Sequence, residues 1–225
     1  MFLQEPETKL TITIPDHIQL NEFIHLYDDH LNKCDLILSE IPEAQRMSRR
    51  NAGFHSGVAV IGALANDLPP GEHYLLEVGV WKGASLSFAA LCGGAELNCF
   101  GIDPFQFKGQ LNETRSIINS FGLNHNVRLF ADSSGNVPRE ILAVAGHIDI
   151  IHIDGSHTFE DCARDILLYW HFLKPGGWMI VDDYFDNASS PEVRPAVDYI
   201  IEQELLTPTT HGTHECLDSY LFKKD

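Results

Sequence analysis

The chain is poor in basic residues: 15 Lys and Arg stand against 32 Asp and Glu, which gives a formal net charge of −17 with neutral histidine. Because a nucleic-acid backbone is bound by clustered Lys and Arg, this deficit argues against nucleic acid as a partner. No uninterrupted apolar run approaches the roughly 20 residues of a membrane-spanning helix. The N-terminal stretch also lacks the basic start and apolar core of a secretory signal. We therefore expect a cytoplasmic protein with neither nucleic acid nor a membrane as partner.

Cysteine is scarce as well, with five widely spaced residues and no Cys-x-x-Cys pair. This pattern argues against a disulfide scaffold or a zinc ribbon and is typical of buried free thiols in a reducing compartment. The remaining composition, 44% hydrophobic and 21% charged, is that of a packed globular domain and argues against disorder.

The breaker Pro69-Pro70-Gly71 divides the chain into two regions. Residues 1–70 are predicted to form an N-terminal helical extension, with a short edge strand at 10–14 and a second helix at about 52–66. Between these two elements, apolar residues recur at steps of four and three and predict a helix with one apolar stripe: Leu20, Ile24, Tyr27, Leu31, Cys34, Leu38 and Ile41. This stripe either packs against its own domain, where the extension could act as a lid, or forms a homodimer contact.

Residues 71–225 are predicted to form an α/β domain. Strands buried on both faces of a parallel sheet are short and almost continuously apolar, and five runs fit this description: 74–80, 97–102, 127–131, 148–153 and 178–181. Helical segments separate them, most clearly at 158–173, where Thr158 and Asp161 have the spacing of a capping box. The alternation predicts right-handed crossovers and a doubly wound, mostly parallel sheet.

Carboxylates stand near the C-terminal end of each apolar run: Glu77, Asp103, Asp132, Asp154 and the pair Asp182-Asp183. Since parallel strands point the same way, these acids should gather along one edge of the sheet, where open α/β sheets bind ligands. One acid could simply cap the next helix. Like charges at five successive strand ends repel one another, however, so we expect a cationic or hydroxyl-rich ligand among them.

The loop after the first run carries Gly79 and Gly83, small residues that let a ligand approach the backbone. A dinucleotide fingerprint would have another glycine where this chain has Trp81. This departure weakens a nicotinamide-dependent oxidoreductase, which remains one alternative. Another nucleoside-using transferase and a non-catalytic cofactor-binding or interaction protein are the others.

The next two strand ends extend the nucleoside interpretation. A carboxylate at Asp103 can accept hydrogen bonds from both hydroxyls of a ribose. Asp132 and Ser133, after the third run, could face an adenine. Together with the glycine loop, these residues outline a site for an adenosine-containing ligand.

Five segments resemble the class I S-adenosylmethionine-dependent methyltransferases, and the likeness extends over about residues 74–222. They are LLEVGVWKGAS (75–85), FGIDP (100–104), ADS (131–133), IHIDGSH (151–157) and LKPGGWMIVDDY (173–184). The last two are most similar to the metal-dependent macrocin and sugar O-methyltransferase branch. The resemblance implies a Rossmann-like, mostly parallel sheet of about seven strands that follows the N-terminal helical extension.

The resemblance also implies a role for each site residue. The residues matching the cofactor site are Glu77, Gly79, Gly83 and Ser85 at the methionine end, Asp103 at the ribose, Asp132 and Ser133 near the adenine, and Asp154 beside them. The residues matching the metal ligands of the branch are Asp154, Asp182 and Asp183. His157 matches its general base.

The chemistry of an alcohol acceptor explains why a metal is expected. With water at roughly 15.7 as proxy for the hydroxyl and histidine at about 6.5, full deprotonation would cost about 12 kcal/mol. A lone histidine base adds roughly 10²–10⁴ in rate and does not close that gap, whereas a divalent cation that coordinates the hydroxyl could close much of it. Three carboxylates are hard oxygen ligands, which favours Mg²⁺, leaves Mn²⁺ and Ca²⁺ as alternatives and argues against Zn²⁺.

We therefore predict an O-methyltransferase that uses S-adenosylmethionine and a divalent cation on a small-molecule hydroxyl. Sugar, polyketide, phenol and amine acceptors stay open. His152 is interpreted as a hydrogen-bonded core residue, because it lies within a buried strand, and His211 and His214 as parts of a polar loop.

Overall fold

The computed structural model describes residues 20–41, 56–185, 188–213 and 218–225. Its strands are β1 (His73–Val78), β2 (Leu97–Asp103), β3 (Val127–Ala131), β4 (Ile148–Ile153), β5 (Leu173–Val181), β6 (Pro208–Thr213) and β7 (Tyr220–Lys224). Its helices are α1 (Leu20–Ser39), α2 (Ser56–Asn66), α3 (Ala84–Gly93), α4 (Gln110–Ser120), α5 (Arg139–Leu142), α6 (Phe159–Trp170) and α7 (Val193–Glu202), with a 3₁₀ turn at Gly94–Glu96. The edge strand expected at 10–14 lies outside the described residues.

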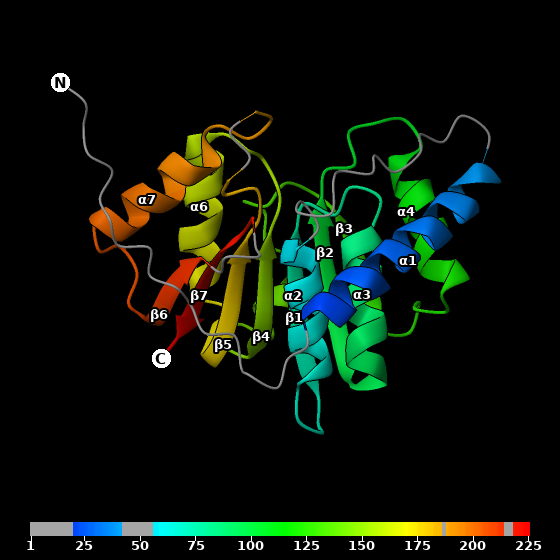
Figure 1. The fold of residues 1–225 in the computed structure, drawn as a ribbon, viewed down its shortest axis with the longest axis horizontal. Coiled ribbons are helices and arrows are strands. Elements are labelled where there is room, and N and C mark those ends of the chain that lie inside the picture. The colour runs from blue at the N-terminus through cyan, green and yellow to red at the C-terminus, as the bar shows by residue number, and fades with distance from the viewer. Residues whose placement is uncertain (1–19, 42–55, 186–187, 214–217) are drawn as a thin grey trace.

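All seven strands form one sheet in the order β3-β2-β1-β4-β5-β7-β6 (Figure 1). The pairs from β3 to β5 are parallel, whereas β7 is antiparallel to both β5 and β6. The predicted Rossmann-like, mostly parallel sheet of about seven strands is confirmed. The topology brings the carboxyl ends of β1 to β5 to one edge, and the switch point of the winding lies between β1 and β4.

The two faces of the sheet carry different helices. Side chains of α2 and α3 pack on one face with Leu75, Cys99 and Ile150. Side chains of α6 and α7 pack on the other face with Leu76 and Ile151. Alternate residues of buried strands serve opposite faces, which is why these runs are apolar throughout.

Helix α1 crosses over α2, α3 and α4 on the first face, as Figure 1 shows. The buried members of its stripe are Tyr27, Leu31, Cys34 and Leu38. They form one cluster with Val58, Ala84, Phe88 and Ile117 of the same chain. The stripe is thus covered by its own chain, and the homodimer through this helix stays a prediction. Helix α2 packs directly on the sheet, so residues before 71 contribute to the same core.

Helix α6 follows its predicted pattern closely. The Thr158 side chain accepts a hydrogen bond from the Asp161 N–H at 3.3 Å and caps the helix. The helix ends at Trp170 rather than at 173, because Leu173 is fully buried as the first residue of β5 and pairs with Ile148. The strand passes through the Pro-Gly-Gly segment that the sequence marks as a helix stop.

Candidate functional site

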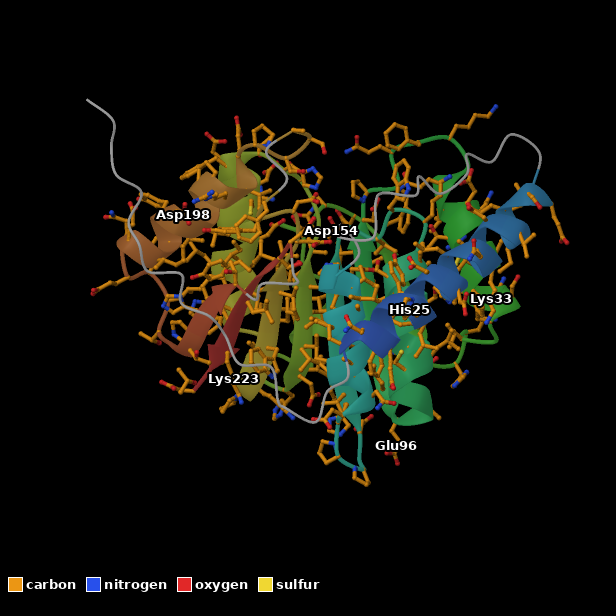
Figure 2. The ribbon with its side chains drawn as sticks, in the orientation of Figure 1. His25, Lys33, Glu96, Asp154, Asp198 and Lys223 are labelled. Atoms are coloured by element: carbon orange, nitrogen blue, oxygen red, sulfur yellow. The ribbon has the colours of Figure 1, made fainter. Side chains whose placement is uncertain are left out.

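The predicted acids lie along the carboxyl edge of the sheet, but they fall into two groups. Figure 2 shows Asp154 at this edge near the middle of the sheet, and Glu96 and Lys223 near the opposite edge. Glu77 and the acids that follow β4 and β5 lie together around the switch point. Asp103 and Asp132 lie at the ends of β2 and β3, farther out along the same edge.

Asp103 holds the loops that surround it. Its Oδ2 accepts hydrogen bonds from the backbone N–H groups of Val80 at 3.0 Å and Trp81 at 2.8 Å. Its Oδ1 accepts from the Phe105 N–H at 2.6 Å and, more weakly, from the Gln110 amide at 3.4 Å. A carboxylate has about four acceptor positions, and all four are used in this conformation. Ribose binding at Asp103 would therefore require an exchange, and the Gln110 contact is the weakest of the four.

The glycine loop between β1 and α3 is shaped by contacts within the protein. Gly79 has φ +89°, and a Cβ there would stand 1.9 Å from the Asp154 carbonyl oxygen. Gly83 has φ +79° and lies against the Thr114 side chain. Close packing of the loop already accounts for both glycines, so they are compatible with a ligand without requiring one. Ser85, in the first turn of α3, is half-buried.

Trp81, which replaces the glycine of a dinucleotide fingerprint, has φ +51° and is 41% exposed. Its carbonyl accepts hydrogen bonds from Gln110 and Thr114, which fix the backbone. The indole makes an edge-on contact with the exposed Phe107 ring at 5.3 Å between centroids. The structure thus presents two firmly anchored aromatic rings beside the glycine loop.

Asp132 and Ser133 lie at the solvent-exposed end of β3. The Asp132 carboxylate accepts bonds from the Asn136 amide and the Ser133 N–H, and these two contacts lower its pKa. A groove of about 610 Å³ begins here and is lined by residues 129–132 and 136–139. Of the sequence-predicted site residues, only Asp132 lines this groove, so it is separate from the acids of β4 and β5.

The first ligand group at the switch point joins Asp154, His157 and Asp183. His157 Nε2 lies 3.2 Å from Asp183 Oδ2 and 3.8 Å from Asp154 Oδ1. The Ser190 hydroxyl donates to Asp183 Oδ2 at 2.9 Å, so its oxygen is left to accept from His157 Nδ1–H at 3.0 Å. This arrangement leaves the Nε2 lone pair of a neutral His157 toward the carboxylates.

The second ligand group joins His152, Asp154 and Asp182. His152 Nδ1 donates to Glu77 Oε1 at 2.9 Å, and Nε2 lies 3.8 Å from Asp182 Oδ2. Ser219 donates to the other Asp182 oxygen at 2.7 Å. The groups share Asp154. Asp183 has φ +60°, a turn that lets two consecutive aspartates face different histidines.

The charges of this cluster change the proton affinities of its members. Burial raises the pKa of Asp154 to about 7, with the charges of Asp182 and Asp183 adding to the effect and His157 opposing it. Burial would lower the pKa of His152, but its contacts with Asp182 and Glu77 outweigh this and raise it to about 10. Burial likewise acts to raise the pKa of Asp182, yet His152 and Ser219 hold it below its usual value.

Two buried atoms of the cluster fit an absent positive or donor group. Among the described residues, Glu77 Oε2 and His152 Nε2 have no hydrogen-bond partner, although their side chains are 2% and 0% exposed. A carboxylate oxygen in this position suits the ammonium group at the methionine end of S-adenosylmethionine. The oxygen-rich set around Asp154 suits a divalent cation. The residues present therefore fit both groups that the family resemblance implies.

Sequence reasoning missed three contributors to this cluster. His152 was interpreted as a core residue, and it is buried, yet it contacts both Glu77 and Asp182. Ser190 and Ser219 carry no sequence signal, because serines are common in the segments that connect helices and strands. The spacing of His152 and Asp154, two residues apart at the end of one strand, was the available clue, since such residues point to the same side.

Comparisons with known proteins agree with this architecture. A family model described as a methyltransferase domain matches residues 76–184. The chain is 31% identical over 153 residues to the uncharacterized protein R132 of Acanthamoeba polyphaga mimivirus, with 66% of this chain and 68% of that protein covered.

Two solved structures show the same fold. The O-methyltransferase TomG of Streptomyces achromogenes, involved in tomaymycin synthesis and solved with SAM, has a TM-score of 0.61 at 12% identity, with 95% of this chain and all of that chain covered. The SAH-bound methyltransferase PaMTH1 of Podospora anserina has a TM-score of 0.62 at 16% identity, with 95% and 98% covered.

Strand order and family match together define a Rossmann-like transferase domain. The chain belongs to the methyltransferase domain family and is a class I S-adenosylmethionine-dependent methyltransferase. This decides against the nicotinamide-dependent and non-catalytic alternatives. No helix among the described residues is both long and apolar enough to cross a membrane.

Proposed function

We propose that the protein is an O-methyltransferase that acts on a hydroxyl group of a small molecule with the help of a divalent cation. The observation that carries the proposal is the cluster of three aspartates and His157 at the switch point of the sheet, next to Glu77. A methyltransferase that only aligns a good nucleophile needs no cation. The three aspartates at the switch point, whose negative charges are only partly neutralised, therefore favour a cation-assisted reaction.

The cofactor-binding residues of this proposal are those along the edge from β4 to β3. Glu77 Oε2 would accept from the ammonium group, the loop of Gly79, Gly83 and Ser85 would lie along the methionine part, and Asp103 would contact the ribose. Asp132 and Ser133 stay predicted as the adenine end. When bound, S-adenosylmethionine supplies an electrophilic methyl group and a positive charge that the acidic edge favours.

His157 is the proposed general base. The hydroxyl group of Ser190 fixes its ring by accepting from Nδ1–H, so that Nε2 of the neutral form is the nitrogen proposed to take a proton. Its side chain is 33% exposed, so an acceptor can reach it from solvent. Asp154, Asp182 and Asp183 would hold a divalent cation, which lowers the pKa of a nearby hydroxyl and lessens the gap that a lone histidine cannot close.

A hydroxyl acceptor is favoured over more reactive nucleophiles by this donor set. Thiols and amines ionise or lose a proton at far lower pH than alcohols and do not need a hard cation. The similarity in fold to TomG, an O-methyltransferase involved in tomaymycin synthesis, supports the same class. The exposed Trp81–Phe107 pair offers an apolar surface for a ring-containing acceptor.

The test is methyl transfer from isotope-labelled S-adenosylmethionine to a library of sugars, polyketides, phenols and amines, with and without prior chelation. We expect labelled products only from hydroxyl acceptors, and loss of transfer after chelation with recovery on adding a divalent cation. Products formed only from amines, or transfer that survives exhaustive chelation, would contradict the respective part of the proposal. Calorimetric binding of S-adenosylmethionine, measured in parallel, shows whether the treated protein still has its cofactor site.

A further inference from the structure

His152 is a fully buried histidine whose two ring nitrogens have different surroundings. Nδ1 donates a hydrogen bond to Glu77 Oε1 at 2.9 Å, which fixes the orientation of the ring. Nε2 is buried and has no hydrogen-bond partner among the described residues. Because a buried polar atom without a partner destabilises the folded protein, we expect a ligand to bind at Nε2.

Nε2 faces two carboxylates that lie too far away to form a hydrogen bond with it. Asp182 Oδ2 lies 3.8 Å away, and one oxygen of Asp154 completes a group whose atoms all lie within 4.8 Å of one another. A distance of 3.8 Å exceeds the range of roughly 2.7–3.2 Å for an N–H···O bond. Two ligand atoms that each lie about 2.1 Å from one cation stand about 3.0–3.4 Å apart. A small movement of His152 and Asp182 toward each other would therefore bring both atoms within bonding distance of a shared ion.

The neighbours of this group hold its ligand atoms in place. Ser219 donates to Asp182 Oδ1, which leaves Oδ2 toward His152. Gly57 of α2 lies so close that a Cβ there would stand 2.6 Å from Asp182 Oδ1. Glu77 occupies the position of the carboxylate that commonly accepts from the second nitrogen of a metal-bound histidine. Contacts with Ser219, Gly57 and Glu77 thus fix the positions of the Asp182 and His152 side chains.

We propose that His152 Nε2, Asp154 and Asp182 bind one divalent first-row transition cation, such as Mn²⁺, Fe²⁺, Co²⁺ or Zn²⁺. The inference rests on the divalent cation of the proposed function and adds a nitrogen ligand to it. Imidazole suits these ions, whereas Mg²⁺ takes oxygen ligands almost exclusively. The nitrogen therefore shifts the expected metal away from Mg²⁺. A ligand nitrogen must be unprotonated, so cation binding releases the proton from the ring.

The experiment is pulsed electron paramagnetic resonance of Mn²⁺ added to the full-length, chelator-treated protein. A directly bound imidazole couples its nitrogen to the manganese spins, and labelling histidine with ¹⁵N must change that coupling. We expect the coupling in the wild type, and its loss in His152→Gln together with at least about 10–100-fold weaker Mn²⁺ binding. His157→Gln is the matched control, because it removes the other histidine beside Asp154, and it should keep the coupling.

Three results would overturn the inference: Mn²⁺ bound with no nitrogen coupling, coupling lost in His157→Gln, or no binding of Mn²⁺ or Zn²⁺ by the wild type. If His152→Gln does not fold, the wild type and His157→Gln still decide, since coupling that persists without His157 points to His152. Measurement of S-adenosylmethionine binding in the same samples separates the two proposals. Failure of the metal experiment with intact cofactor binding and methyl transfer leaves the methyltransferase and removes only the nitrogen-ligated cation.

Discussion

The two halves of the carboxyl edge treat their acids in opposite ways. In the half formed by β2 and β3, the Asp103 carboxylate uses all its acceptor positions on protein donors, and Asp132 accepts from Asn136 and Ser133. In the half formed by β4 and β5, the carboxylates contact two histidines and two serines, and Glu77 Oε2 and His152 Nε2 have no hydrogen-bond partner in the described part of the chain. Acids that follow successive strands in the sequence thus differ in how fully their oxygens are hydrogen-bonded.

The difference in hydrogen bonding indicates which half of the edge takes part in methyl transfer. A carboxylate surrounded by N–H donors shapes loops, and its contribution to binding is largely to hold Val80 and Trp81 in place. Buried carboxylates that lie close together favour a nearby positive charge: burial, to which the charges of Asp182 and Asp183 add, raises the pKa of Asp154 to about 7. We therefore expect substitutions near β4 and β5 to change turnover, and substitutions near β2 and β3 to change cofactor affinity.

The largest expected effect belongs to His157. Its replacement by glutamine should lower turnover by about 10²–10⁴-fold, because the general base is lost. Binding of S-adenosylmethionine should be retained, since His157 is the proposed base and is not among the proposed cofactor-binding residues. The measurement is kcat in the presence of the best hydroxyl acceptor, alongside calorimetry of the cofactor. His211→Gln is the control: this histidine lies in β6 rather than in the polar loop expected from the sequence, contacts Tyr220 of β7, and belongs to neither ligand group. A His157→Gln enzyme with full turnover would break the contrast between the halves.

The sequence predicts the fold because its signals are local and repeated. The five apolar runs and the helix begun by Thr158 depend on periodicity and capping, and the structure has a strand at each run and a helix after Thr158. The bounds differ by more than one residue at three places: β1 ends at Val78 rather than at 80, β5 begins at Leu173 rather than at 178, and α6 ends at Trp170 rather than at 173. The convergence of acids also follows from topology, since parallel strands bring their ends to one edge. Family motifs added the cofactor, which no periodicity contains.

What could not be predicted is how each acid is satisfied. Nothing in the sequence distinguishes Asp103, which accepts from three backbone N–H groups, from Asp154, which faces other charges. These contacts depend on loop paths such as the positive φ of Asp183. His152 illustrates the same limit: burial was predicted correctly, but its partners come from strands that are distant in sequence.

A second buried histidine differs from His152 in its surroundings and affects how the stability of the fold depends on pH. His30 of α1 hydrogen-bonds Ser87 and lies among aromatic rings without a carboxylate, so burial lowers its pKa to about 4, partly opposed by the Ala84 backbone. The unfolded chain, with an ordinary pKa near 6.5, binds more protons between these values, so stability falls as pH drops from about 6.5 to 4. The full effect is about 3 kcal/mol.

Urea unfolding of the wild type and of His30→Gln between pH 4 and 7.5 measures this effect. Other carboxylates also contribute to the pH dependence, and the difference between the two proteins isolates His30. We expect the wild type to lose more stability than the variant as the pH falls. Identical slopes would show that His30 accepts a proton in the folded state, which contradicts the role of burial.

Asp103 and Asp132 provide a matched pair within the other half. Asp103→Asn removes an acceptor for backbone N–H groups and should weaken cofactor binding by about 10–100-fold, because each hydrogen bond to a charged group contributes about 1.5–3 kcal/mol. Asp132→Asn, at an exposed position, should weaken it far less. Calorimetric titration with S-adenosylmethionine measures both. Equal losses would show that the two acids contact the cofactor alike, and unchanged affinity in Asp103→Asn would remove the ribose assignment.

The smallest effect is expected at Ser190, which acts only through His157. Its hydroxyl donates to Asp183 and accepts from His157 Nδ1, so Ser190→Ala frees the ring without removing the base. One such hydrogen bond contributes about 1–1.5 kcal/mol, which corresponds to a fall in kcat of about 10-fold.

A positioning role predicts that this fall appears in kcat while KM and cofactor affinity stay unchanged. Ser190→Thr, which keeps the hydroxyl group, should restore most of the rate. A fall in thermal stability that accompanies equal losses in both variants would instead mean that the 1% exposed Ser190 only fills space beneath the loop. Ser190 contacts Asp183, one of the three carboxylates proposed for the cation, but the group of His152, Asp154 and Asp182 does not include Asp183. A cation held by that group, such as Mn²⁺, should therefore still bind in both Ser190 variants. Substitution of Ser190 thereby separates the orientation of the base from the binding of the cation within the same cluster.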